Sequence, residues 1–100
     1  MKEEKVLNLL HMSRKAGKLT LGFDACERSC HSGHSKLILV ASDLAEKQKL
    51  KITSVAEAYN VKWVEIGTKK LLGEAFNTRN LGIISVDDQN FAKGIKKWIS

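Results

Sequence analysis

The sequence predicts a three-layer α/β/α sandwich, in which about four strands lie between two layers of helices. Strand-length apolar segments alternate with helical periods along the chain, and residues 36–41 form a continuous apolar run typical of a central strand covered on both faces. The chain also has 100 residues, of which 43% are hydrophobic and none is proline. This size and composition suit one compact core, so we expect residues 1–100 to form a single domain.

The first half of the chain is predicted to begin with a helix that has an acidic first turn and ends at Gly17. Alternating apolar residues at 19–21 predict a short strand. A second helix begins at Gly22 and ends at Gly33, because apolar or small side chains repeat at helical spacing between them. The apolar run at 36–41 is the next strand.

A longer helix is predicted at residues 45–59, because this stretch contains no helix breaker and is followed by Asn60. We expect its buried stripe to include Leu50, Val55 and Tyr59.

The last third of the chain continues the alternation. Thr68 is placed to cap a helix, and the carboxylates of Asp87 and Asp88 suit the positive end of another. The apolar face expected on the last helix consists of Phe91, Ile95, Trp98 and Ile99. The predicted elements are a strand at 61–66, a helix at 69–76, a polar turn at 77–80, a strand at 81–86 and a helix at 87–99.

The charge balance makes polyanions plausible partners. Lysine and arginine number 17 against 11 acidic residues, which gives a net charge of +6. Each half of the chain carries +3, so there is no basic tail and a basic surface has to be assembled by folding. No apolar run reaches the roughly 20 residues of a membrane helix, and the first residues do not look like a secretory leader. We expect a cytoplasmic protein with no membrane partner.

The sequence contains no local signature of an enzyme. The segment from Gly17 to Gly22 has the glycine spacing of a phosphate-binding loop, but Phe23 and Asp24 stand where lysine and a hydroxyl residue are needed. The pair Asp87-Asp88 at a helix start is interpreted as a cap and not as an acid–base dyad. We therefore expect a protein that is not an enzyme.

One cluster could supply thiolate and imidazole ligands to a metal: Cys26, Cys30, His31 and His34. Structural zinc sites usually take ligands from two separated pieces of chain, whereas these four lie in one short helix and its end. The favoured interpretation is two buried cysteines and two surface histidines, with no bound metal and no cofactor. The alternative is a small metal-responsive regulator.

Several segments, in this order and spacing, give the chain a resemblance to a known family. They are Arg14-Lys15-Ala16-Gly17-Lys18-Leu19 leading to Gly22, the G-x-x-K-L-apolar-apolar-apolar-A-x-D pattern from Gly33 to Asp43, Leu72-Gly73-Glu74-Ala75, and Phe91-Ala92-Lys93. Together they resemble the ribosomal protein L-seven-Ae family of kink-turn RNA binders, and within it the small bacterial YlxQ-like branch. The resemblance covers nearly the whole chain and implies an α/β/α sandwich with a mixed four-stranded sheet.

The resemblance also implies where RNA is contacted. Family members dock through the exit of the first strand into the second helix and through the loop after the fourth helix. Tight kink-turn binders usually carry Asn-Glu where this chain has Asp24-Ala25, and Lys where it has Arg28. Carried over to this sequence, the implied RNA-binding residues are Lys18, Gly22, Phe23, Asp24, Ala25, Arg28, Asn77, Thr78, Arg79 and Asn80.

The function that the resemblance implies is non-catalytic binding of structured RNA, either kink-turn-like or ribosomal, with the ribosome as a partner and a monomer as the free protein. The alternative is an accessory protein-interaction module of the translation apparatus in which RNA binding is weak or lost. Asp24 and Ala25 keep this alternative open, because an aspartate cannot donate as an amide does and an alanine cannot hydrogen-bond a guanine edge.

Overall fold

Helices and strands alternate along residues 2–99, the part of the chain that the computed structural model describes. Every predicted element is present, with bounds that differ by one or two residues at an end. Within residues 2–99 no helix is long and apolar enough to span a bilayer. In chain order the elements are α1 (Lys2–Lys15), β1 (Leu19–Leu21), α2 (Phe23–His31), β2 (Leu37–Val40), α3 (Glu46–Ala58), β3 (Lys62–Glu65), α4 (Lys69–Ala75), β4 (Ile83–Val86) and α5 (Gln89–Ile99).

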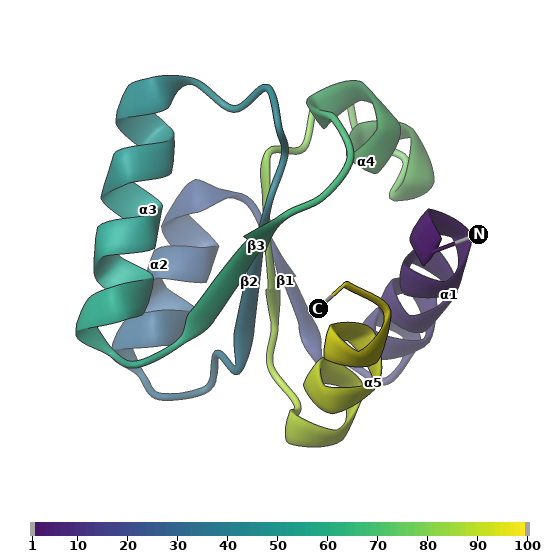
Figure 1. Ribbon diagram of the computed structural model, residues 1–100, viewed down its shortest axis with the longest axis horizontal. Helices are drawn as coiled ribbons and strands as arrows, with labels where there is room; N and C mark the ends of the chain where they lie inside the picture. Colours follow the sequence, from purple (N-terminus) through teal and green to yellow (C-terminus); the bar gives the residue numbers. More distant parts are fainter. Residues whose placement is uncertain (1, 100) are drawn as a thin grey trace.

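The four strands form one mixed sheet in the order β1-β4-β2-β3. Strand β4 is antiparallel to both of its neighbours, whereas β2 and β3 are parallel. Helices α2 and α3 cover one face of the sheet, and α1 and α5 cover the other, with α4 at one end of the α1 side (Figure 1). The predicted three-layer α/β/α sandwich is confirmed.

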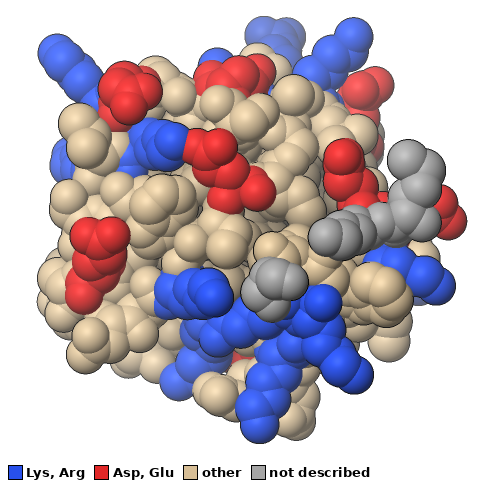
Figure 2. Space-filling view, viewed as in Figure 1, with Lys and Arg blue, Asp and Glu red and all other residues tan. Residues whose placement is uncertain are grey.

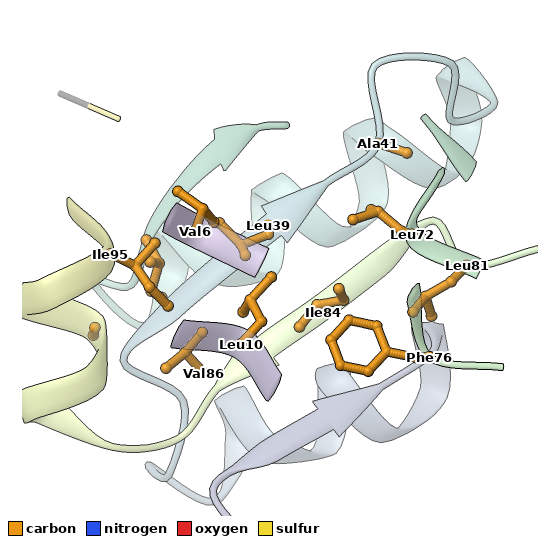
Figure 3. Packing of buried hydrophobic residues seen from close by; sticks show 12 residues of the cluster. Val6, Leu10, Leu39, Ala41, Leu72, Phe76, Leu81, Ile84, Val86 and Ile95 are labelled. Carbon is orange, nitrogen blue, oxygen red and sulfur yellow. The ribbon is translucent and has the colours of Figure 1, made fainter. Parts of the chain in front are cut away.

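Strand β2 separates two hydrophobic cores because its side chains alternate between the faces of the sheet. Leu37 and Leu39 pack in the core beneath α1, α4 and α5, and Ile38 and Val40 pack in the core beneath α2 and α3. All four side chains are fully buried, as the continuous apolar run predicts. Figure 3 shows the first core, in which the ring of Phe76, just after α4, lies beside Ile84 of β4.

Helices α1, α2, α3 and α4 all end in the same hydrogen-bonded turn, in which a residue of positive φ follows the helix. At α2 the N–H of Gly33 donates to Cys30 and the N–H of His34 donates to Ser29. Only glycine and asparagine occupy this position, because their left-handed backbone costs least. The four residues are Gly17 (φ 71°), Gly33 (φ 81°), Asn60 (φ 58°) and Asn77 (φ 57°).

The predicted buried stripe of α3 is wrong at two of its three positions. Leu50 is 62% exposed and Tyr59 is 46% exposed, and only Val55 packs against the core. The buried face is formed instead by residues that include Ile52 and Ala56, which are one helical turn apart. Leu50 is five residues from Val55, which is not a helical spacing, so the two cannot share one face, and Tyr59 follows the last residue of the helix.

Trp98 was expected on the apolar face of α5 and is 40% exposed. The ammonium of Lys5 lies 5.8 Å from the centroid of its ring. Ile95 is fully buried, and Phe91 and Ile99 are partly buried against the same hydrophobic core. The rest of the predicted apolar face is therefore confirmed.

Candidate nucleic-acid interface

The two main predicted RNA-binding segments, residues 22–28 and 77–80, begin or end at the same end of the sheet. There the carboxyl ends of β1, β2 and β3 meet the amino end of β4, at the upper end in Figure 1. The N–H of Gly22, just after β1, donates to the carbonyl of Ile83, the first residue of β4, at 3.0 Å. We call this end, with residues 22–28 and 77–82, the loop edge.

The amino terminus of α2 is open toward solvent at the loop edge. Gly22 precedes the helix with φ 93° and ψ 160°, and within residues 2–99 no side chain caps the helix by a hydrogen bond. A Cβ atom built on Gly22 would meet no atom within 4 Å. The first N–H groups of an α-helix have no partner inside the helix, and together with the helix dipole they favour an anion or a hydrogen-bond acceptor.

Two exposed side chains of opposite charge lie one turn apart on α2. Asp24 is in its first turn and Arg28 is in its last turn, and both are exposed to solvent. Because residues four apart share a helix face, the guanidinium and the carboxylate are presented on the same side. Phe23 and Ala25 are only partly exposed, so they offer backbone and apolar surface more than side-chain polarity.

The second segment is held rigidly against α4. Asn77 takes the left-handed conformation, and the N–H of Thr78 donates to the carbonyl of Gly73 at 2.8 Å. A Cβ atom on Gly73 would lie 2.8 Å from the Thr78 carbonyl oxygen and 3.0 Å from that of Arg79. Residue 73 therefore has to be glycine for the loop to pack here. The side chains of residues 77–80 are all exposed.

Lys18 is the implied residue that the structure separates from the others. It precedes β1, whereas Gly22 follows it, and its carbonyl accepts from the N–H of Asp87 at the far end of β4. Four residues of extended chain span roughly 13 Å. Lys18 therefore lies near the opposite end of the sheet from the loop edge.

A shallow cavity of about 370 Å³ adjoins the loop edge and includes residues that no motif in the sequence indicates. Phe23 and Asp24 form one side of it, and Lys47 and Lys51 of α3 contribute to the other. The ammonium of Lys51 lies 5.4 Å from the centroid of the Phe23 ring. Lys47 and Lys51 are four apart on an exposed helix face, but only the packing of α3 beside α2 shows that this face adjoins the candidate site.

A carboxylate at the opposite end of the sheet from the loop edge fixes α2 to the sheet. Asp87 accepts hydrogen bonds from Thr20 of β1 at 2.5 Å, from Ser29 of α2 at 2.7 Å and from Ser85 of β4 at 2.6 Å. Their position at a helix start predicts that both aspartates, Asp87 and Asp88, cap a helix. Asp88 does cap α5, accepting from the N–H of Phe91 at 3.0 Å, but Asp87 instead joins three elements.

The cysteine and histidine cluster does not converge. Cys26 and Cys30 are buried free thiols, and Cys26 donates to the Thr20 carbonyl at 3.4 Å. Burial raises the pKa of both thiols, and the nearby Asp87 carboxylate also raises them. The histidines bond elsewhere, His31 to Tyr59 and His34 to Ser32. In the described part of the chain, no three His, Cys, Asp or Glu residues are grouped to hold a metal.

Known proteins resemble this chain in sequence and in structure. It is 29% identical over 100 residues to RNA-binding protein YlxQ of Enterococcus faecium, covering 96% of this chain and 92% of the relative. It is 25% identical over 84 residues to RNA-binding protein YlxQ of Bacillus subtilis, covering 84% of each chain.

Two solved structures share the fold. One is a Bacillus halodurans protein of unknown function, with a TM-score of 0.88, 24% identity and coverage of 95% of this chain and 96% of the other. The second is the 15.5kD RNA binding protein of Giardia lamblia, with a TM-score of 0.79, 20% identity and coverage of 98% of this chain and 84% of the other.

The model of the family described as "Ribosomal protein L7Ae/L30e/S12e/Gadd45 family" matches residues 4–95. Because this match spans the sheet, the loop edge and most of α5, the chain belongs to the ribosomal protein L7Ae/L30e/S12e/Gadd45 family.

Proposed function

We propose that this protein binds structured RNA without catalysing a reaction, and that the loop edge docks on a kink-turn or a similarly bent RNA. The observation that carries the proposal is the hydrogen bond from Gly22 to Ile83, which sets the open amino terminus of α2 beside the exit of the α4–β4 loop. The curated relatives named RNA-binding protein YlxQ support it.

The geometry suits a bent RNA better than a straight duplex. The deep, narrow major groove of an A-form helix does not admit side chains, whereas a kink splays bases and exposes their edges. Free N–H groups at the start of α2 can donate to phosphate or base-edge acceptors, and the absence of a Cβ on Gly22 lets the RNA approach the backbone. Arg28 on α2 and Arg79 in the α4–β4 loop are both exposed and add cationic donors.

The proposal is tested by titrating the protein, at two salt concentrations, with a standard kink-turn and with a straight duplex of equal length. We expect tighter binding to the kink-turn, with both affinities falling as salt rises. The double change Arg28→Ala and Arg79→Ala is expected to weaken kink-turn binding by at least about tenfold, because each arginine supplies a charge-assisted contact. The thermal midpoint should hardly move, since both side chains are exposed.

A matched control removes the same charge from the exposed face of α1, with Lys5→Ala and Lys15→Ala. This control should lower both affinities slightly and leave the preference for the kink-turn unchanged. Equal weak binding to both RNAs would contradict kink recognition, and no binding at low salt would contradict RNA binding altogether.

A protein-interaction module of the translation apparatus is the second candidate, and Asp24 is the observation that favours it. An exposed carboxylate in the first turn of α2 competes with phosphate for the same N–H groups. Co-sedimentation with ribosomes that survives the loss of Arg28 and Arg79 would support this candidate. We propose for either function that the protein acts in the cytoplasm as a monomer.

A further inference from the structure

A second hollow lies at the opposite end of the sheet from the loop edge. It has a volume of about 320 Å³, close to the lower limit of ligand-sized cavities. Three parts of the chain form it: the loop between α2 and β2, the turn between α3 and β3, and one side of α5. We call it the lysine pocket, because it is lined by Lys36, Lys62 and Lys96, together with Tyr59, Asn60 and Gln89.

Basic side chains predominate among the charged residues that line the lysine pocket. Within the described chain, its lining includes three lysines and no aspartate or glutamate. Lys36 and Lys62 are exposed, and Lys36 donates to the carbonyl of Gly33 at 3.3 Å. The positive charge of Lys36 and Lys62 beside the pocket favours an anion as its ligand.

The walls of the pocket are held in place before any ligand arrives. Two of the left-handed helix ends, Gly33 and Asn60, fix the turns that carry Lys36 and Lys62. The hydroxyl of Tyr59 lies 2.6 Å from Nδ1 of His31, and the two rings meet edge to face with centroids 5.0 Å apart. Part of the Tyr59 ring is open to solvent, which leaves a surface on which a base can stack.

The surroundings favour a long anion over a small one. Figure 2 shows the face of the molecule that is seen in Figure 1. Lysine and arginine side chains gather in its lower half, around α5 and the adjoining end of the sheet, and most visible acidic groups lie above them. Lys93 and Lys97 of α5 are exposed on either side of Lys96. Basic side chains therefore continue beyond the pocket, as is expected where a strand of phosphates passes over a surface.

We propose that the lysine pocket binds one nucleotide of a single-stranded RNA segment, with its phosphate among the lysines and its base against Tyr59. This inference rests on the proposed function in that RNA is the partner. Because the pocket and the loop edge lie at opposite ends of the strands, the protein has two separate RNA contacts and can hold a bent duplex and a flanking single strand together.

The test uses a labelled 12-nucleotide oligouridine and the double variant Lys36→Gln and Lys62→Gln, with Lys5→Gln and Lys15→Gln as the matched control. Each phosphate contact that is lost should reduce the salt dependence of log K by about 0.7 for a single strand. We expect the oligouridine affinity of the pocket variant to fall by at least ~5-fold at 0.1 M salt. The affinity of the control variant should fall by less than ~2.5-fold. Tyr59→Leu should weaken binding without changing the salt dependence, because stacking carries no charge.

Equal effects of the two lysine pairs, or no effect of either, would overturn the proposal. Saturable binding of inorganic phosphate by the pocket, with oligouridine affinity unchanged in the pocket variant, would overturn it in favour of a small-anion site. The kink-turn is titrated in parallel. If the pocket variant loses oligouridine binding but no kink preference exists, the proposed function fails and the pocket proposal stands. If the kink preference depends on Arg28 and Arg79 but oligouridine affinity is unchanged in the pocket variant, the pocket proposal fails and the proposed function stands.

Discussion

The N–H of Gly22 donates to the carbonyl oxygen of Ile83 at 3.0 Å, which couples the start of α2 to the end of the α4–β4 loop. These two segments are separated by about 60 residues of sequence, and the sheet brings them together because β1 and β4 are neighbours. The backbone of Gly22 (φ 93°, ψ 160°) belongs to a region that is almost restricted to glycine. A change at Gly22 therefore acts on both segments.

Gly22→Ala is expected to lower the free energy of unfolding by about 1–3 kcal/mol and to weaken kink-turn binding. The added methyl group meets no atom within 4 Å, so the loss comes from the backbone conformation and not from a clash. Urea denaturation and RNA titration measure the two effects. Gly17→Ala is the control, because Gly17 has φ 71° and an equally open environment at the other end of β1. It should lose stability while keeping RNA preference, and equal RNA defects in both variants would contradict a role of Gly22 in the interface.

Gly73→Ala is expected to move the α4–β4 loop. The new methyl group would lie within 3.0 Å of two backbone carbonyl oxygens of that loop, and backbone cannot rotate aside as a side chain can. Overpacking of this kind costs about 1–3 kcal/mol, which exceeds the gain of up to about 1 kcal/mol that alanine brings to a helix. RNA affinity should therefore fall together with stability.

Gly94→Ala in α5 is the matched control for that helix substitution. Its methyl group would lie 3.6 Å from Leu9, an ordinary contact distance. We expect stability to rise by up to about 1 kcal/mol and RNA binding to stay unchanged. A Gly73→Ala variant that behaves like Gly94→Ala would show that the loop does not need its present position.

The sequence could predict features that depend on local backbone chemistry. The ends of three helices follow from Gly17, Gly33 and Asn60, because only glycine and asparagine take a left-handed turn at low cost. The central position of β2 follows from its apolar run, because only a strand buried on both faces needs one.

Features that depend on which elements pack together could not be predicted in this way. Thr53 and Ala56 are buried in α3, but neither side chain is apolar enough for the sequence to predict which face of the helix is buried. Asp87 looked like a second helix cap, and only the fold brings the hydroxyls of Thr20 and Ser29 to it. The proximity of Lys51 to Phe23 depends likewise on the packing of α3 against α2.

Asp24→Asn is expected to raise kink-turn affinity about 3- to 10-fold at low salt, because it removes a negative charge beside the N–H groups of α2 and adds an amide donor. The same change should lower stability by about 0.3–1 kcal/mol, since an acidic residue in a first helical turn interacts favourably with the dipole. Filter binding and thermal denaturation separate the two effects. Glu3→Gln, which removes the same charge from the first turn of α1, should lower stability similarly without a specific gain in affinity.

The thiols of Cys26 and Cys30 are expected to resist alkylation in the folded protein. Burial and the Asp87 carboxylate raise the pKa of each thiol, so the reactive thiolate is scarcer at pH 8 than for an ordinary cysteine. Labelling with iodoacetamide should therefore follow the rate of unfolding and should not respond to added zinc. Rapid modification of the folded protein, or protection by zinc, would contradict this prediction and favour the metal-responsive alternative.

Asp87→Ala is expected to destabilise the fold more than Asp88→Ala does. Loss of the Asp87 carboxylate leaves the hydroxyls of Thr20 and Ser29 without their acceptor and removes one of the two partners of Ser85, at a cost of about 2–4 kcal/mol. Loss of Asp88 removes one helix cap, which costs about 0.5–2 kcal/mol. Asp87→Asn keeps one acceptor oxygen and should recover part of the difference. Urea denaturation ranks the three variants, and equal losses for the two alanine variants would mean that Asp87 contributes no more than a cap. A correct ranking would show that the carboxylate stabilises α2 against β1 and β4 from the end of the sheet opposite the loop edge.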